Sequence, residues 1–180
     1  CGIVLENGTI YEADIVISAA DGYDTIFRML DGKYIDNTIK YNYENLELFP
    51  SFIEVSLGVA NSFPDMAPLI SFPLEKPYVL PDDSTTKRVM LHIYNYDPTL
   101  APEGKTSMNL ILETKNYEFW TNLKKNDPEK YKQIKEKIAN DLIDLIDKQI
   151  KGIKGNVEVI DVATPATIIR HTNNWKGSME

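Results

Sequence analysis

The fold is organised by a stretch near the start of the chain, Gly2–Asp21, which reads GIVLENGTIYEADIVISAAD. Asn7 and Gly8 separate two apolar runs, and this pair predicts a β-hairpin because both central residues of a type I′ turn need a positive φ. The β-branched run Ile15–Ile17 predicts a third, buried strand. Small residues follow that strand and would let another backbone or a ligand come close: Ser18, Ala19 and Ala20.

Capping signals and alternation predict the next elements. Residues 22–32 predict a short helix that Gly32 ends in a left-handed conformation, and residues 36–45 predict a second short helix. Near-strict alternation from Ile53 to Val59 predicts a strand with one buried face.

Prolines dominate the segment between residues 61 and 87. They exclude a helix and a central strand, because proline lacks the backbone donor that both need. Short edge strands remain possible at 69–72 and 78–80, and Asp82–Thr86 predicts a turn at the surface.

Two further strands are predicted at 88–95 and 107–113. Apolar residues occur at both phases of each strand, so we expect both faces of their sheet to be covered. A short helix is expected around residues 117–124.

A long amphipathic helix is predicted next, because Asp127 and Pro128 form a strong helix start and apolar residues then recur at three- and four-residue steps until Gly152. A last strand at 157–162 and a short helix or turn from Thr164 follow. The order of elements predicts an α+β fold: a mixed, largely antiparallel sheet packed against a long helix, with a leading β-hairpin.

Composition excludes several classes of function. The net charge is −8, so a nucleic-acid binder with a basic face is not expected. The only cysteine is Cys1, which rules out an internal disulfide and a cysteine-based zinc site and favours a reducing, cytoplasmic location. Because the chain starts with this residue inside a strand pattern, we expect it to be a fragment of a longer protein.

Motifs of the common enzyme classes are missing from the sequence, including the Walker loop, G-x-S-x-G and G-x-G-x-x-G. The two histidines, His92 and His171, are isolated in sequence, so no metal site is predicted. The aromatic residues Tyr94, Tyr96, Phe119, Trp120 and Trp175 are candidates to line an apolar cavity, and their alternative role is an ordinary core.

Three segments together resemble the flavin-dependent oxidoreductases that include phytoene desaturases, carotenoid isomerases and retinol saturases, within the amine-oxidase-like flavoproteins. Gly2–Asp21 resembles a G-V-x-L-x-[DN]-G … A-D-x-V-[IV]-S-x-A-D passage of this family. Leu100–Ser107 resembles its A-P-x-G-K turn. Ala163–Ser178 is similar to its T-P-x-T-[FW]-x-R-[YF]-T … G-S segment, although Ile168 and His171 replace common aromatic residues.

The resemblance implies a division of the chain. Residues 1–21 would be a remnant of an FAD-binding domain, residues 22–163 a substrate-binding domain, and residues 164–180 a segment that returns towards the FAD domain. FAD is therefore expected in the full-length parent. No FAD is expected to stay bound to this fragment, which we expect to be inactive because both main flavin motifs are absent.

The resemblance also implies roles for individual residues, although no catalytic residue is assigned. Ser18, Ala19, Ala20 and Asp21 would lie beside the adenosine side of the flavin. Trp175 and Gly177 would lie near the flavin ring or the substrate entrance. The residues expected to line the substrate, in an apolar cavity under the sheet, are Tyr94, Tyr96 and Trp120.

Two functions remain open. The first is a central substrate-binding fragment of an FAD-dependent oxidoreductase that transfers hydride between flavin and an apolar, polyene-like substrate. The second is a non-enzymatic ligand-binding or interaction domain. Association with a membrane is left open, since a lipid-soluble substrate favours it and no basic amphipathic helix supports it. The leading strands could also pair between copies of the fragment.

Overall fold

Two separately packed units make up the computed structural model, which describes residues 1–178: Cys1–Leu46, and a second unit that begins at Glu47. The α+β fold predicted from the sequence is confirmed, with a leading hairpin, an antiparallel sheet and a long helix. No helix among the described residues has both the length and the apolar character needed to cross a membrane.

The predicted hairpin forms the start of the first unit. Strands β1 (Gly2–Val4) and β2 (Ile10–Glu12) pair in antiparallel fashion. Gly8 lies in the turn with a φ of 82°, and the side chain of Asn7 accepts a 3.0 Å hydrogen bond from the Thr9 amide. The turn therefore uses both residues in the way that the Asn-Gly pair predicts.

The prediction of a buried strand at Ile15–Ile17 is wrong for this structure. The segment is irregular, and the side chains of Ile15 and Ile17 are 78% and 88% exposed. A strand needs a neighbour that pairs with its backbone groups, and the only sheet described in this unit contains β1 and β2.

Two short helices complete the first unit. The first is a π-helical turn, η1 (Asp24–Met29), shorter than the predicted helix at 22–32. The second is α1 (Asn37–Asn45), which begins as predicted because the Asp36 side chain accepts a 2.7 Å hydrogen bond from the Ile39 amide. The two helices share a cluster of aromatic rings: Tyr23, Phe27 and Tyr43.

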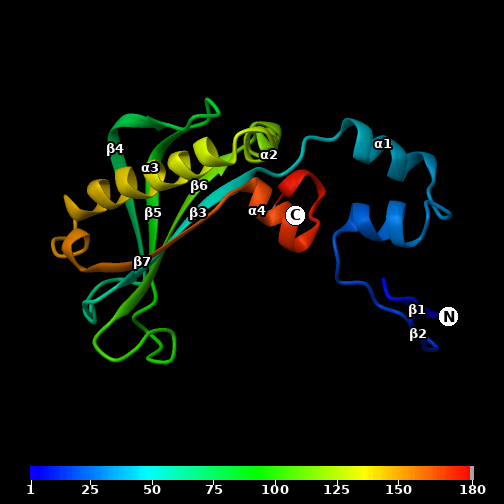
Figure 1. Cartoon of the computed structure of the whole chain (residues 1–180), viewed down its shortest axis with the longest axis horizontal. Helices are drawn as coiled ribbons and strands as arrows, with labels where there is room; N and C mark the ends of the chain where they lie inside the picture. Colours follow the sequence, from blue (N-terminus) through cyan, green and yellow to red (C-terminus); the bar gives the residue numbers. More distant parts are fainter. Residues whose placement is uncertain (179–180) are drawn as a thin grey trace. The chain divides into compact units, whose positions relative to one another are not determined.

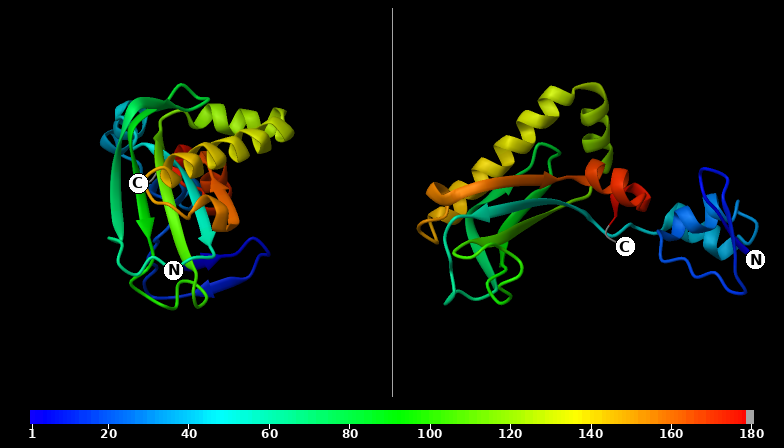
Figure 2. Two further views of the ribbon diagram at one scale, coloured as in Figure 1. Left: turned by 90° about the vertical axis from the view of Figure 1, so that its left-hand side faces the viewer. Right: turned by 60° about the horizontal axis from the view of Figure 1, so that its bottom comes forward.

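The second unit is built on a five-stranded antiparallel sheet in the order β4-β5-β6-β3-β7. Helix α3 (Pro128–Asp147) lies along one face of this sheet (Figures 1 and 2). The strands are β3 (Ser51–Val59), β4 (Leu69–Val79), β5 (Thr85–Ile93), β6 (Thr106–Thr114) and β7 (Val157–Ala163).

The core lies between the sheet and α3. Every second residue of β3 is buried, from Ser51 to Val59, and β6 alternates in the same phase. The helix contributes its apolar stripe, including Leu142 and Ile146, which are fully buried. Buried side chains fill most of this space, and a hollow remains on this side of the sheet between α3 and β7.

The opposite face of the sheet, which we call the open face, is only partly covered. Side chains there are half-buried or exposed, and Met90 is 42% exposed. The expectation that both faces would be covered is therefore wrong. Polar side chains such as Glu54, Ser56 and Asn109 lie on this face, and they stay half-buried.

Proline-rich β4 is a continuous edge strand. It includes both of the short edge strands that the sequence predicts, at 69–72 and 78–80, up to Val79. Between them, from Pro73 to Tyr78, the pairing of β4 with β5 is irregular. The turn after it is formed as predicted, but Asp82 in that turn is only 5% exposed. Its carboxylate accepts hydrogen bonds that make burial possible, from the Trp120 indole at 2.7 Å and the Ser84 amide at 3.0 Å.

The second unit also contains a helix before α3 and short helical segments before and after β7. They are α2 (Tyr117–Asn126), η2 (Lys154–Asn156), α4 (Pro165–Thr172) and η3 (Trp175–Gly177). Helix α3 begins at Pro128 as predicted and ends at Asp147, before the predicted end. The Asp147 side chain accepts hydrogen bonds from the amides of Ile153 and Lys154, at 3.1 and 2.9 Å, and so stabilises the turn that replaces the last helical residues.

Candidate functional site

A row of polar side chains crosses the middle of the open face. The strand register pairs His92 with Asn109, Asn109 with Ser56, and Ser56 with Asp161. Because directly opposed residues in a sheet project to the same side, these four side chains share the face that α3 leaves uncovered. We call them the polar row.

Glu54 lies next to the polar row, two positions before Ser56 in β3. The Asn109 amide nitrogen donates a hydrogen bond to the Glu54 carboxylate. Burial raises the pKa of Glu54, the nearby Asp161 carboxylate raises it further, and His92 acts in the opposite direction. The open face thus holds a carboxyl group that binds its proton more tightly than an ordinary glutamate does.

A groove of ≈ 540 Å³ begins at the polar row. Asn109, Ser56 and Asp161 line one part of it, and Gly58 leaves a space on the sheet because it has no side chain. The far side is formed by Ala101, Pro102 and other residues of the turn that precedes β6. Lys105 and Glu158 also line the groove, where they form an ion pair.

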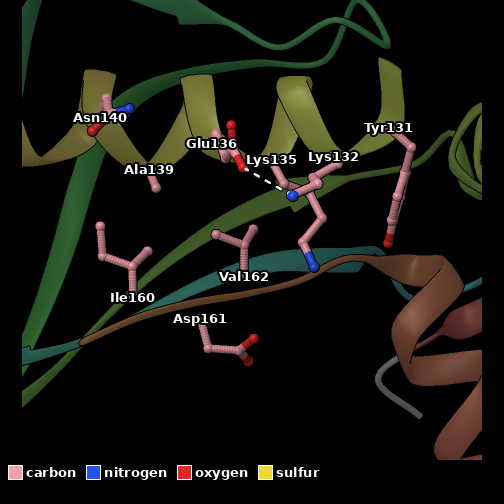
Figure 3. A pocket seen from close by; sticks show the side chains of 9 residues that line it. All are labelled: Tyr131, Lys132, Lys135, Glu136, Ala139, Asn140, Ile160, Asp161 and Val162. Carbon is pink, nitrogen blue, oxygen red and sulfur yellow. Dashed lines mark ion pairs between the residues drawn. The ribbon is translucent and has the colours of Figure 1, made fainter. Parts of the chain in front are cut away.

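A second hollow of ≈ 440 Å³ lies between α3 and β7 (Figure 3). Figure 3 shows Ile160 and Val162 on the side of β7 that faces α3, with Asp161 on the other side. The helix contributes charged side chains, and Lys132 Nζ lies 4.0 Å from Glu136 Oε1. Since the opposite charges in this hollow lie on one exposed helix surface, a solvated helix face explains them.

The predicted cofactor residues Ser18–Asp21 form a hydrogen-bonded loop in the first unit. The Ser18 hydroxyl lies 2.7 Å from that of Thr25, and the Ala20 amide donates to Ser18 Oγ at 3.3 Å. The Asp21 carboxylate accepts a 2.9 Å hydrogen bond from the Asp24 amide. Ala19 and its neighbours are exposed, so the backbone there is open to a nucleotide, and the FAD-binding role stays a prediction.

Trp175 and Gly177 lie together in η3 of the second unit. Gly177 is buried with a φ of 70°, and a Cβ atom there would lie 3.2 Å from Pro165, so only glycine fits without strain. Lys176 Nζ lies 5.1 Å from the centre of the Trp175 ring. These contacts explain a tight chain reversal after α4, and contact with flavin remains a prediction.

The predicted substrate-lining residues lie in different environments. Tyr94 lines a hollow of ≈ 220 Å³ beside the 97–105 loop, and its ring centre is 6.2 Å from that of Tyr96. Tyr96 is 64% exposed, whereas Trp120 is fully buried in the core. Trp120 therefore has a structural partner in Asp82, and the substrate-lining role of all three residues remains untested.

Sequence reasoning missed the residues that the sheet brings together on the open face. Glu54, Asn109 and Asp161 come from three strands, and none belongs to a recognised motif. The alternation of β3 contained the usable signal, because Glu54, Ser56 and Gly58 share the phase opposite to the buried residues. Among residues 1–178, no three His, Cys, Asp or Glu side chains gather as a metal site would need.

Comparison with known proteins gives a consistent set of relatives. No protein-family model matches the chain. It is 31% identical over 172 residues to prolycopene isomerase 2, chloroplastic, of an Oncidium hybrid cultivar, a match that covers 92% of this chain and 28% of the relative. The chloroplastic prolycopene isomerases of Arabidopsis thaliana and Daucus carota are 26% and 28% identical, and each match covers 98% of this chain.

The chain spans 28 to 29% of the length of these relatives. The matches support the resemblance to carotenoid isomerases that the sequence segments indicated. They extend over nearly the whole chain, so the sheet, the long helix and the leading hairpin all lie within the matched region.

Proposed function

We propose that this chain is the central, substrate-binding part of an FAD-dependent oxidoreductase of the carotenoid isomerase and desaturase kind, acting on an apolar polyene. The observation that carries the proposal is the groove on the open face, because it combines apolar lining residues with a few polar side chains, as ligand sites do. The similarity to prolycopene isomerases supports the choice of substrate class.

In this proposal the residues of the chain bind and orient the substrate. Bound flavin would supply the hydride chemistry. The apolar residues that line the groove, such as Val159 and Ala101, would contact the polyene and exclude water, and Gly58 would leave room for it. The exposed residues Ser18, Ala19 and Ala20 have the small side chains that a nearby nucleotide requires, and the glycine-rich phosphate loop is absent from the sequence.

The test uses the full-length gene product. We expect the purified protein to absorb in the flavin bands and to convert prolycopene, followed by chromatographic separation of the isomers. Gly58→Leu would fill the groove, and we expect it to abolish conversion while the flavin absorbance stays. A colourless protein, or a Gly58→Leu variant with full activity, would contradict the proposal.

The second candidate is a non-enzymatic ligand-binding domain. The groove favours it as much as it favours an enzyme, because a groove alone carries no chemistry. A colourless full-length protein that still binds an apolar polyene would support this second function.

A further inference from the structure

The groove on the open face has a polar end. Its sheet side starts at the polar row with Ser56, Asn109 and Asp161, and continues over Gly58 towards the exposed Val159. A hydrocarbon would leave the polar end unused, and any desolvated polar atom there would lose its hydrogen bonds to water. The composition of the groove therefore suits a ligand with one polar end.

The orientation of Asn109 determines what this end offers. Its amide nitrogen donates to the Glu54 carboxylate, which is adjacent on the same face. A carboxamide has donors only on nitrogen and an acceptor only on oxygen. The bond to Glu54 uses one of the two amide hydrogens and leaves the Asn109 oxygen and the second N–H for a ligand, and a hydroxyl group can pair with both.

The charges at the polar end point to the same kind of ligand. Asp161 lines the groove and Glu54 lies beside it, and the two carboxyl groups interact unfavourably. Lys105, the lysine that lines the groove among the described residues, forms an ion pair with Glu158, which lines it too. A ligand carboxylate would meet the carboxyl groups of Asp161 and Glu54, whereas a neutral donor would meet acceptors there.

We propose that the polar end of the groove binds the neutral, hydrogen-bond-donating head of an apolar ligand, with Asn109 and Asp161 selecting a hydroxyl group against a carboxylate. This rests on the proposed function in that the open face must bind an apolar ligand at all. The ligand class is an isoprenoid-like chain that ends in an alcohol.

The test compares three probes with one carbon skeleton: farnesol, farnesoic acid and farnesene. Binding is followed by isothermal titration at pH 7.5 in the same detergent. We expect farnesol to bind about tenfold more tightly than farnesene, because only the alcohol can donate a hydrogen bond to the Asp161 carboxylate. Farnesoic acid should bind more weakly than the alcohol.

Variants connect this preference to the two residues. Asp161→Asn should reduce the preference for the alcohol over the acid by about tenfold, because it removes one like charge and keeps the size. Asn109→Leu should bring farnesol close to farnesene. Glu113→Gln is the matched control, because it removes one negative charge from the same face at a position that does not line the groove. Circular dichroism confirms that each variant is folded.

The outcomes separate a failure of the hydroxyl selection from a failure of the proposed function. If farnesene binds as tightly as farnesol and the two variants change nothing, the selection of a hydroxyl is wrong while the proposed function stands. Tighter binding of the acid also overturns the selection. If none of the probes binds, ligand binding by the open face fails, and both proposals fail with it.

Discussion

Trp120 Nε1 donates a 2.7 Å hydrogen bond to Asp82 Oδ2, and both residues are buried. Thr114 Oγ1 donates to the same oxygen, and the Ser84 amide donates to the other one. A buried carboxylate is tolerated only when such donors surround it. The pair therefore joins helix α2 to the turn after β4.

Trp120→Phe should lower the free energy of unfolding by about 2–4 kcal/mol, because it removes a donor from a buried carboxylate and leaves a small cavity. Urea denaturation followed by circular dichroism measures the change. Tyr96→Phe is the control and should stay within about 0.5 kcal/mol, since Tyr96 is 64% exposed. Equal unfolding midpoints for Trp120→Phe and the wild type would rule out the role given to this bond.

Tyr131 and Thr164 connect the long helix to α4. Their hydroxyl oxygens lie 2.7 Å apart, and Thr164 also caps α4 in a capping box with Thr167. Tyr131→Phe should cost about 1 kcal/mol of stability, and Thr164→Ala about 1–2 kcal/mol because the cap is lost as well.

A double-mutant cycle on Tyr131 and Thr164 should give a coupling energy of at least about 0.5 kcal/mol. Thr164→Ser keeps the hydroxyl and should preserve most of this coupling. Strictly additive single effects would show that the two hydroxyl groups do not interact in solution.

Glu54 should make stability depend on pH. Because its pKa is raised in the folded state, chiefly by burial, the folded chain binds the proton more tightly than the unfolded chain. The free energy of unfolding therefore falls as pH rises from the pKa of Glu54 in the unfolded chain through its pKa in the folded chain. Above both values the ionised, half-buried carboxylate destabilises the folded chain to its full extent. Glu54→Gln should therefore gain stability relative to the wild type as pH rises.

Urea midpoints measured between pH 4 and pH 8 test this expectation. Asp161→Asn is the companion variant, because removing the neighbouring carboxylate should bring the Glu54 pKa closer to its ordinary value and narrow the pH window. If the urea midpoints of Glu54→Gln and the wild type differ by the same amount at every pH, the raised pKa of Glu54 is contradicted.

Gly58 should control access to the groove. A Cβ atom there would lie 3.2 Å from Val159 Cβ, so Gly58→Ala requires a small shift and Gly58→Leu fills the space. We expect Gly58→Leu to lower the affinity for an apolar probe at least about tenfold by excluding it sterically. Gly155→Ala is the control, because nothing lies within 4 Å of a Cβ at that position. Unchanged affinity in Gly58→Leu would place the ligand elsewhere.

Much of the fold could be predicted because its signals are local. The Asn7-Gly8 turn, the alternation of β3 and the start of α3 each depend on a few adjacent residues. Predictions of elements that form only beside another part of the chain were less successful. Ile15–Ile17 has the composition of a buried strand, but strand formation depends on a neighbour that local sequence does not reveal.

The candidate site could not be predicted for the same reason. Glu54 and Asn109 are separated by 55 positions, and only the register of β3 and β6 brings them into contact. Shifting that register by one residue would turn either side chain to the opposite face. Asp82 illustrates a second limit, since an acidic residue in a turn is normally exposed and only the fold supplies the donors that bury it.

The two outer strands of the sheet are chemically unequal. Pro73 and Pro77 deprive β4 of two backbone N–H groups, and the irregular pairing near them disrupts its regular shape. Strand β7 contains no proline between Val157 and Ala163. An additional strand laid beside β4 would therefore find gaps in its ladder, whereas one laid beside β7 would meet an uninterrupted backbone. The sheet is protected against growth on one side and can be extended on the other.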